Sequence, residues 1–183
     1  MNQLGPIKKY KLQSFSRETI PQDCNINVLF SKDAITLQVV FELTAKLNDL
    51  IIPVFDLSRA KRKDRLWEHT CFEIFLGEDG RSNYREFNLS PSGEWNVYAF
   101  SDYREGMKQE SSFDILPFEV KIFSEQELSL SIAFDLDTIP ALSDLKVGIS
   151  SVLERKDGVK SYWAFSHSGE VPDFHAREGW IQV

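Results

Sequence analysis

Short runs of residues that alternate between apolar and polar recur along almost the whole chain, separated by turn-forming residues. Successive side chains of a β-strand point to opposite faces, so a period of two indicates a strand with one buried face. Gly, Pro, Asp, Asn and Ser, which turns require, interrupt the runs. We predict strands over residues 25–30, 35–44, 50–55, 66–76, 83–90, 94–100, 118–123, 128–134, 146–153, 161–166 and 180–183.

These strands favour one fold class. Residues 124–127 predict a hairpin loop, and a helical segment at 137–144, which contains Pro140, is predicted to span a turn or two. Many short strands with minimal helix are typical of an all-β fold, a β-sandwich or jelly roll of about ten antiparallel strands. No repeat, low-complexity segment or linker divides the 183 residues, so we predict a single domain over residues 1–183.

Charge and cysteine content argue against several classes of function. The net charge of −7 disfavours nucleic acid as a partner, because the phosphate backbone attracts Lys and Arg. No run of residues is long and apolar enough for a signal peptide or a membrane span, so we expect a cytoplasmic protein without a membrane partner. The two cysteines, Cys24 and Cys71, make neither a disulfide framework nor a metal-type pair, and we expect both to be buried.

The predicted strand at 66–76 carries a carboxylate where a core strand should be apolar. Trp67 and Glu73 share one face of this strand, roughly 20 Å apart at ~3.3 Å per residue. A carboxylate accepts hydrogen bonds from hydroxyl groups, and an indole offers a flat apolar surface to a sugar ring. The alternative is an ion pair between Glu73 and a neighbouring strand, with Trp67 covering one end of the sandwich. The strand alone favours that alternative.

The next strand supplies a second carboxylate. Tyr84, Glu86 and Asn88 share one face of this strand, so Glu86 could pair with Glu73 as a glycosidase pairs two carboxyl groups. Asp102 is a further partner for such a pair. Because the chain holds 28 Asp and Glu residues, this pattern alone is weak evidence for catalysis.

The C-terminal segment concentrates aromatic residues and histidines around a Pro-Asp turn. Aromatic and polar side chains gathered in a loop are typical of ring-stacking recognition. The alternative is that these aromatic residues fill the core and that each histidine has a structural role, which is favoured for each histidine taken singly. The histidines have no metal-ligand spacing with the cysteines, and there is no nucleophile elbow or phosphate-binding glycine loop. We therefore predict no catalytic residue and no metal ligand.

Two segments in this order resemble carbohydrate-binding module family 9 and its DOMON-like relatives, in particular their stand-alone bacterial members. The first is RLWEHTCFEIFLGEDGRSNYREFNLSPSGEW, and the second is YWAFSH followed by PDFHAREGW. The resemblance extends from about residue 25 to the C-terminus. It implies a β-sandwich that binds sugars without catalysis, with a terminal sugar held between two aromatic side chains while charged and amide groups contact its hydroxyls.

The resemblance also implies which residues would contact the ligand. Trp67 would be the first aromatic residue and Trp163 the second, with Phe174 as a substitute for Trp163. The complete set of implied ligand-binding residues is Trp67, Glu73, Arg85, Trp163, His167, Phe174 and His175. Members of the family often carry structural calcium, and although this chain has no clear equivalent acidic cluster, structural calcium stays an open alternative. We otherwise expect no cofactor.

The leading hypothesis is therefore a non-catalytic domain that recognises a sugar or a similar small polar ligand. Three alternatives stay open. Some DOMON relatives bind haem through Met and His, and here Met107 and one histidine could serve, although we favour this less. A protein-interaction module that has lost sugar binding is another alternative, with a protein as partner. A glycan-processing hydrolase is the third.

Overall fold

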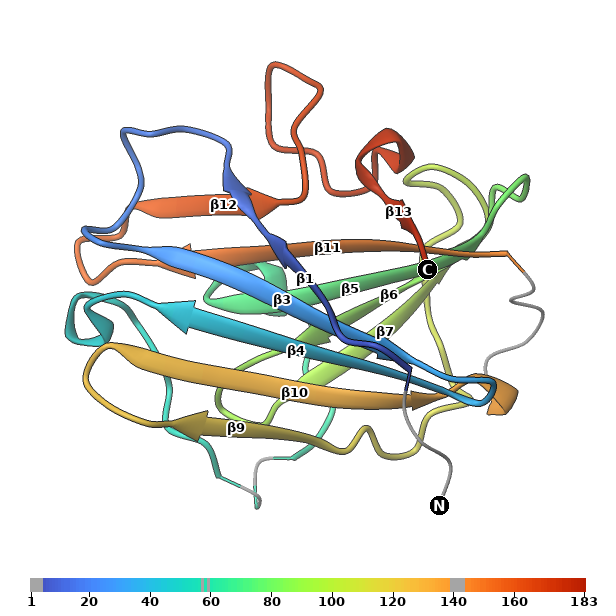
Figure 1. The fold of residues 1–183 in the computed structure, drawn as a ribbon, viewed down its shortest axis with the longest axis horizontal. Helices are drawn as coiled ribbons and strands as arrows, with labels where there is room; N and C mark the ends of the chain where they lie inside the picture. The colour runs from blue at the N-terminus through green and yellow to red at the C-terminus, as the bar shows by residue number, and fades with distance from the viewer. Residues whose placement is uncertain (1–4, 57, 59, 139–143) are drawn as a thin grey trace.

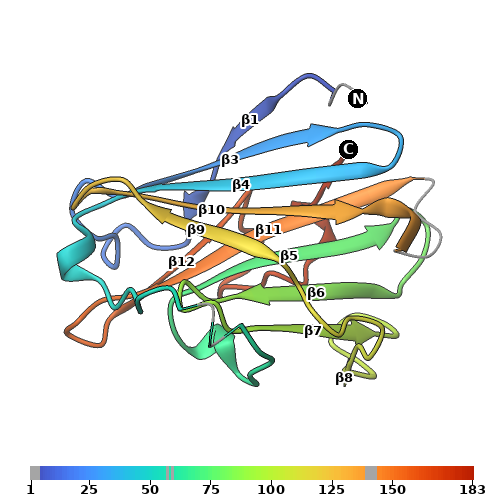
Figure 2. The ribbon, with the colours of Figure 1, turned by 90° about the horizontal axis from the view of Figure 1, so that it is seen from below.

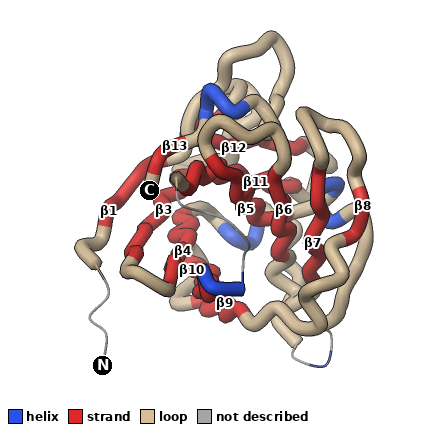
Figure 3. The backbone as a smooth tube through the Cα atoms, turned by 90° about the vertical axis from the view of Figure 1, so that its right-hand side faces the viewer, coloured by secondary structure: helices blue, strands red, loops and turns tan. Residues whose placement is uncertain are grey.

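Two antiparallel β-sheets lie face to face and form a β-sandwich (Figures 1 and 2). The structure is a computed structural model that describes residues 5–56, 58, 60–138 and 144–183. Figure 3 shows the same two layers from the side of the molecule. The predicted all-β sandwich is confirmed.

The smaller sheet has five strands in the order β1-β3-β4-β10-β9. They are β1 (Lys8–Lys11), β3 (Asn25–Lys32), β4 (Thr36–Thr44), β10 (Glu127–Asp135) and β9 (Phe118–Ile122). In β3, β4 and β10 buried residues alternate with more exposed ones, as expected for a sheet that packs on the core with one face only.

The larger sheet has the order β2-β12-β11-β5-β6-β7-β8, and β13 also pairs with β11. Its strands are β2 (Gln13–Ser14), β12 (Lys160–Ala164), β11 (Leu145–Glu154), β5 (Cys71–Glu78), β6 (Tyr84–Leu89), β7 (Trp95–Phe100), β8 (Lys108–Gln109) and β13 (Ile181–Gln182). The central strands of this sheet are buried on both faces: in β5, every residue from Cys71 to Gly77 is buried.

The core between the sheets is built from large apolar side chains of both layers. The ring centroids of Phe41 in β4 and Phe72 in β5 are 5.0 Å apart, and those of Phe87 and Phe134 are 4.8 Å apart. Burying each such side chain stabilises the fold by roughly 1.5–3 kcal/mol. Cys24 and Cys71 are buried with free thiols, which confirms the expectation for both.

A second, smaller aromatic cluster covers the outer face of the larger sheet. It consists of Phe75, Tyr84, Tyr98, Phe100 and Trp180, with Trp67 and Phe174 packed against it. The Trp180 ring can lie flat on the sheet because Gly148 has no side chain: a Cβ on Gly148 would approach Trp180 Nε1 to 2.5 Å. This cluster explains why the larger sheet is buried on its second face.

The described helices are all single 3-10 turns: η1 (Leu47–Asp49), η3 (Leu66–Glu68), η4 (Leu136–Thr138) and η5 (Arg177–Gly179). None of the helices in the described ranges has the length and apolar character needed to cross a membrane. η4 falls at the start of the helical segment predicted at 137–144, and residues 139–143 of that segment lie outside the described residues.

Most predicted strands coincide with observed ones to within a few residues, and the hairpin loop between β9 and β10 is confirmed. Two strand predictions are wrong. Residues 50–55 form no strand beyond a bridge from Leu50 to Arg155, and Pro53 within them cannot donate a ladder hydrogen bond. The strand predicted from residue 66 begins at Cys71 instead, because residues 66–68 form η3. The short strands β1, β2 and β8 were not predicted.

Candidate ligand-binding site

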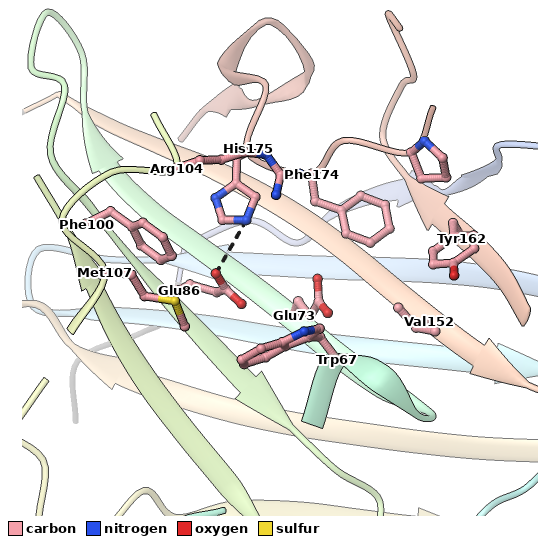
Figure 4. A pocket seen from close by; sticks show the side chains of 11 residues that line it. Trp67, Glu73, Glu86, Phe100, Arg104, Met107, Val152, Tyr162, Phe174 and His175 are labelled. Atoms are coloured by element: carbon pink, nitrogen blue, oxygen red, sulfur yellow. Dashed lines mark ion pairs between the residues drawn. The ribbon is translucent and has the colours of Figure 1, made fainter. Parts of the chain in front are cut away.

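A cavity of about 320 Å³ lies on the outer face of the larger sheet (Figure 4). Strands β5, β6, β7, β11 and β12 contribute to its lining, and η3 and two loops complete it. The lining residues are Trp67, Glu73, Glu86, Phe100, Arg104, Met107, Val152, Tyr162, Pro172, Phe174 and His175. Aromatic rings thus surround two carboxyl groups.

Glu73 lies in the middle of β5 and is only 2 % exposed. It is paired in register with Ser150 of β11 on one side and with Asn88 of β6 on the other. The Ser150 hydroxyl donates a hydrogen bond to Glu73 Oε2 at 2.7 Å. The second oxygen, Oε1, is buried and has no hydrogen-bond partner among the described residues. In Figure 4 this carboxyl group points into the cavity.

Glu86 of β6 lies diagonally across from Glu73 on the same face, since Glu73 pairs with Asn88 and Phe75 with Glu86. Asn88 Nδ2 donates to Glu86 Oε1 at 2.7 Å. Burial raises the pKa of Glu86 to about 7. Burial, and next the charge of Glu86, raise the pKa of Glu73 to about 8. At neutral pH the two carboxyl groups therefore hold at least one proton between them for most of the time.

The His175 ring faces the Glu86 carboxyl group from the loop that covers the sheet (Figure 4). Burial and the charge of Arg104 lower the pKa of His175 to about 4, so its ring is neutral at pH 7. His175 Nε2 is 3.7 Å from Glu86 Oε2, and we interpret this as a contact with a neutral ring, not as an ion pair. His175 Nδ1 lies 2.6 Å from the hydroxyl oxygen of Tyr84, which fixes the ring.

Asp173 joins its own loop, which follows β12, to the loop after β7 that carries Tyr103 and Arg104. Its carboxylate accepts hydrogen bonds from Tyr103 Oη, from Arg104 Nη2 at 2.7 Å and from the backbone N–H of His175 at 3.1 Å. Arg104 has a left-handed backbone with φ of 54°, and its N–H donates to Tyr84 Oη at 3.2 Å. These contacts hold His175 and Arg104 in place beside the carboxyl groups.

Trp67 reaches the cavity from η3 and not from the strand. Arg65, which precedes η3, has a left-handed backbone with φ of 62°. The Trp67 ring then packs edge-on against Tyr98, with ring centroids 5.4 Å apart. Trp67 and Glu73 line the same cavity. The predicted separation of roughly 20 Å along one strand does not apply, because Trp67 is not on that strand.

Phe174 forms another part of the wall and is held by its backbone. Its carbonyl oxygen accepts a hydrogen bond from Trp180 Nε1 at 3.1 Å. In the view of Figure 4 the Glu73 carboxyl lies between the rings of Phe174 and Trp67. An aromatic ring on either side of hydrogen-bonding groups is an arrangement that can hold a flat, hydroxyl-bearing ring.

The structure brings four of the seven implied residues together in this cavity: Trp67, Glu73, Phe174 and His175. Whether they bind a ligand stays a prediction. Trp163 is not among them, because strand alternation in β12 points Tyr162 outward and Trp163 into the core. There Trp163 is 3 % exposed, and its Nε1 donates to Ser161 Oγ at 2.9 Å.

The other two implied residues also lie outside the cavity lining. Arg85 has the opposite parity to Glu86 in β6, and its Nε donates to Glu110 Oε2 at 2.9 Å. His167 Nε2 lies 2.9 Å from the carbonyl oxygen of Gln13, and its ring packs edge-on against Phe15. Both side chains are engaged in contacts between neighbouring segments.

Haem and calcium can be tested against these residues. Met107 and His175 both line the cavity, but both ring nitrogens of His175 face protein groups, Tyr84 and Glu86. An axial haem ligand needs one free ring nitrogen, and His175 as placed does not offer one. No group of three or more His, Cys, Asp or Glu within the described ranges could hold a metal ion.

Sequence reasoning missed several lining residues, among them Arg104 and Tyr162, and weighed Glu86 only as part of a catalytic pair. A signal for Glu86 was present, because Tyr84, Glu86 and Asn88 share one face of β6. The neighbouring strand β5 carries Glu73 on the same face of the sheet. Arg104 carries no such signal, since it lies in a loop whose position depends on Asp173, far away in the sequence.

The fold is similar to solved structures. A candidate carbohydrate-binding protein from Bacteroides uniformis matches with a TM-score of 0.72 and 13 % identity, over 96 % of this chain and 85 % of that chain. This likeness shows a shared fold. No family model and no curated protein matches the sequence.

Two structures of a carbohydrate-binding module family 9 domain from Caldicellulosiruptor kristjanssonii score lower. The complex with cellotriose matches at 14 % identity and a TM-score of 0.44, over 86 % of this chain and 71 % of that chain. The complex with glucose matches at 15 % identity and a TM-score of 0.39, over 79 % and 68 %. TM-scores below 0.5 do not establish a shared fold.

Proposed function

We propose that the cavity binds a sugar or a similar small polar ligand without catalysis. The observation that carries the proposal is Glu73 Oε1, a buried acceptor without a partner among the described residues, within a cavity lined by aromatic rings. An unpaired buried polar atom costs about 1–3 kcal/mol, which a ligand donor would recover. The cavity volume of about 320 Å³ is at the lower end of ordinary ligand sites.

The ligand would lie between Trp67 and Phe174. Its C–H face would pack on these rings, while its hydroxyl groups would donate to Glu73 and accept from Glu73 or Glu86 in their protonated forms. A carboxyl group that holds a proton can both donate and accept, which suits hydroxyl groups. The Bacteroides uniformis protein of the same fold is a candidate carbohydrate-binding protein, and we extend that ligand class to this chain as part of the proposal.

Isothermal titration with a panel of mono- and oligosaccharides, followed in parallel by tryptophan fluorescence, tests the proposal. We expect one sugar to bind with saturation, Trp67→Ala to weaken binding at least about tenfold, and Trp67→Phe to retain most of it, since one lost stacking contact costs ~1 kcal/mol or more. Phe123→Ala, which removes an aromatic ring exposed near the end of β9, is the matched control and should change nothing. Full affinity in Trp67→Ala would refute the site.

A glycan-processing hydrolase is the second candidate, because two carboxyl groups with raised pKa values line one cavity. Against it, glycosidases keep one of the two carboxyl groups ionised, whereas burial favours the protonated form of both here. Incubation with nitrophenyl glycosides separates the two candidates. Turnover would favour the hydrolase, and binding without release of nitrophenol would favour the binding domain.

A further inference from the structure

The two carboxyl groups in the cavity can accept more hydrogen bonds than the neighbouring side chains donate to them. Ser150 and Asn88 each donate one hydrogen bond, to Glu73 Oε2 and to Glu86 Oε1. Glu73 Oε1 has no partner among the described residues, and Glu86 Oε2 contacts His175 Nε2 at 3.7 Å, which is longer than a hydrogen bond. Both oxygen atoms belong to buried side chains, which are 2 % and 5 % exposed. A ligand that satisfies both must present several donors close together.

A negative charge on either carboxyl group would have no dedicated counterion in the cavity. The one cationic side chain of the lining is Arg104, and its guanidinium donates to Asp173 at 2.7 Å. Asp173 is thus the nearest anion to that charge, and the Arg104 side chain is about half exposed. His175 is neutral at pH 7. The charge of Arg104 lowers the pKa of both glutamates, but burial outweighs it, so the protein compensates a charge on either glutamate only in part.

We infer that the ligand carries a primary amine, so that an amino sugar is the ligand class and its ammonium group binds between Glu73 and Glu86. This rests on the proposed function, which supplies the sugar ring. An ammonium group has three donors and no acceptor, which matches two carboxyl oxygens that lack strong partners. The aromatic rings of Trp67 and Phe174 favour a nearby cation as well as the C–H face of the ring.

Binding of an ammonium group would change the protonation of both glutamates. Burial favours the protonated form of each carboxyl group in the free protein. A bound ammonium would reverse this preference, because an opposite charge within a few ångströms stabilises the carboxylate. A neutral sugar would leave the carboxyl groups as they are.

The test compares glucosamine, N-acetylglucosamine and glucose, together with the corresponding galactose series, by isothermal titration to the full chain at pH 7. Acetylation removes the positive charge and keeps the ring. We expect the amino sugar of one series to bind about 10–100-fold more tightly than both neutral forms, as for a hydrogen bond between charged groups. Glu73→Gln, which keeps the shape and the Ser150 contact, should abolish this preference.

Two further variants complete the experiment. Glu86→Gln should also reduce the preference, and Glu119→Gln, which removes an exposed carboxylate from the smaller sheet, should leave it unchanged. Equal affinity for the amino and neutral sugars would overturn the inference and leave the proposed function standing. Absence of binding for every sugar would overturn both.

Discussion

The two sheets of this sandwich use their outer faces differently. In the smaller sheet the outer positions of β3, β4 and β10 are at least partly exposed except at Ser31, and one of the contacts there is an ion pair between Lys9 and Glu42 at 3.0 Å. In the larger sheet the outer face is covered by an aromatic cluster and holds the buried Glu73 and Glu86. A face that is buried and polar at once has a cost in stability, and such a cost is expected where a surface serves binding.

The largest effect is expected in the core that the two sheets share. The first test compares the loss of one core side chain with a change on the outer face of the smaller sheet. Phe41→Ala empties a fully buried position between the sheets, where Phe41 contacts Phe72. We expect the free energy of unfolding to fall by about 3–5 kcal/mol, measured by urea denaturation. Lys9→Ala on the outer face of the smaller sheet should change it by less than about 1 kcal/mol, because exposed ion pairs contribute little. Equal losses would mean that the outer face of the smaller sheet is structural too.

The second test concerns the aromatic layer outside the larger sheet. Gly148→Ala places a Cβ against the Trp180 ring, so the ring must move away from the sheet. We expect a loss of about 1–3 kcal/mol in the free energy of unfolding, and a weaker ligand site because Trp180 holds the Phe174 backbone. The control is Gly169→Ala in the loop after β12, where a Cβ would make only ordinary contacts. An unchanged denaturation midpoint in Gly148→Ala would contradict the packing described for Trp180.

The third test uses pH. Burial raises the pKa of Glu73 to about 8 from its ordinary value near 4.5. The folded state therefore binds more protons than the unfolded state between these values, and stability falls as the pH rises from about 4.5 to 8. Glu73→Gln removes this loss, so the variant should exceed the natural chain at pH 8.5 by about 1.4 kcal/mol or more, the equivalent of one pKa unit. At pH 4 the two should be similar, and a constant difference across the range would disprove the assignment.

Sequence alone predicts the smaller sheet better than the site. In β4 and β10 the alternation of polarity locates both the strand and its buried face. In β12 neighbouring positions hold Tyr162 and Trp163, both aromatic, so the pattern does not reveal which one faces the core. Trp67 was placed on a strand because its parity matches that of Glu73. Its actual position depends on the left-handed Arg65 and on contact with Tyr98, which no local pattern contains.

One strand carries the loop that forms much of the site. β12 and β13 both pair with β11: Ala164 lies opposite Ser150, and Ile181 lies opposite Val147. The intervening segment 165–180 therefore begins and ends beside β11. The two positions of β11 that its ends face are three residues apart, a distance of roughly 10 Å. A segment whose two ends are fixed this way can be lengthened, shortened or rewritten at little entropic cost. The sheet would then act as a constant frame for exchangeable specificity, a property that directed evolution of new binding proteins could exploit.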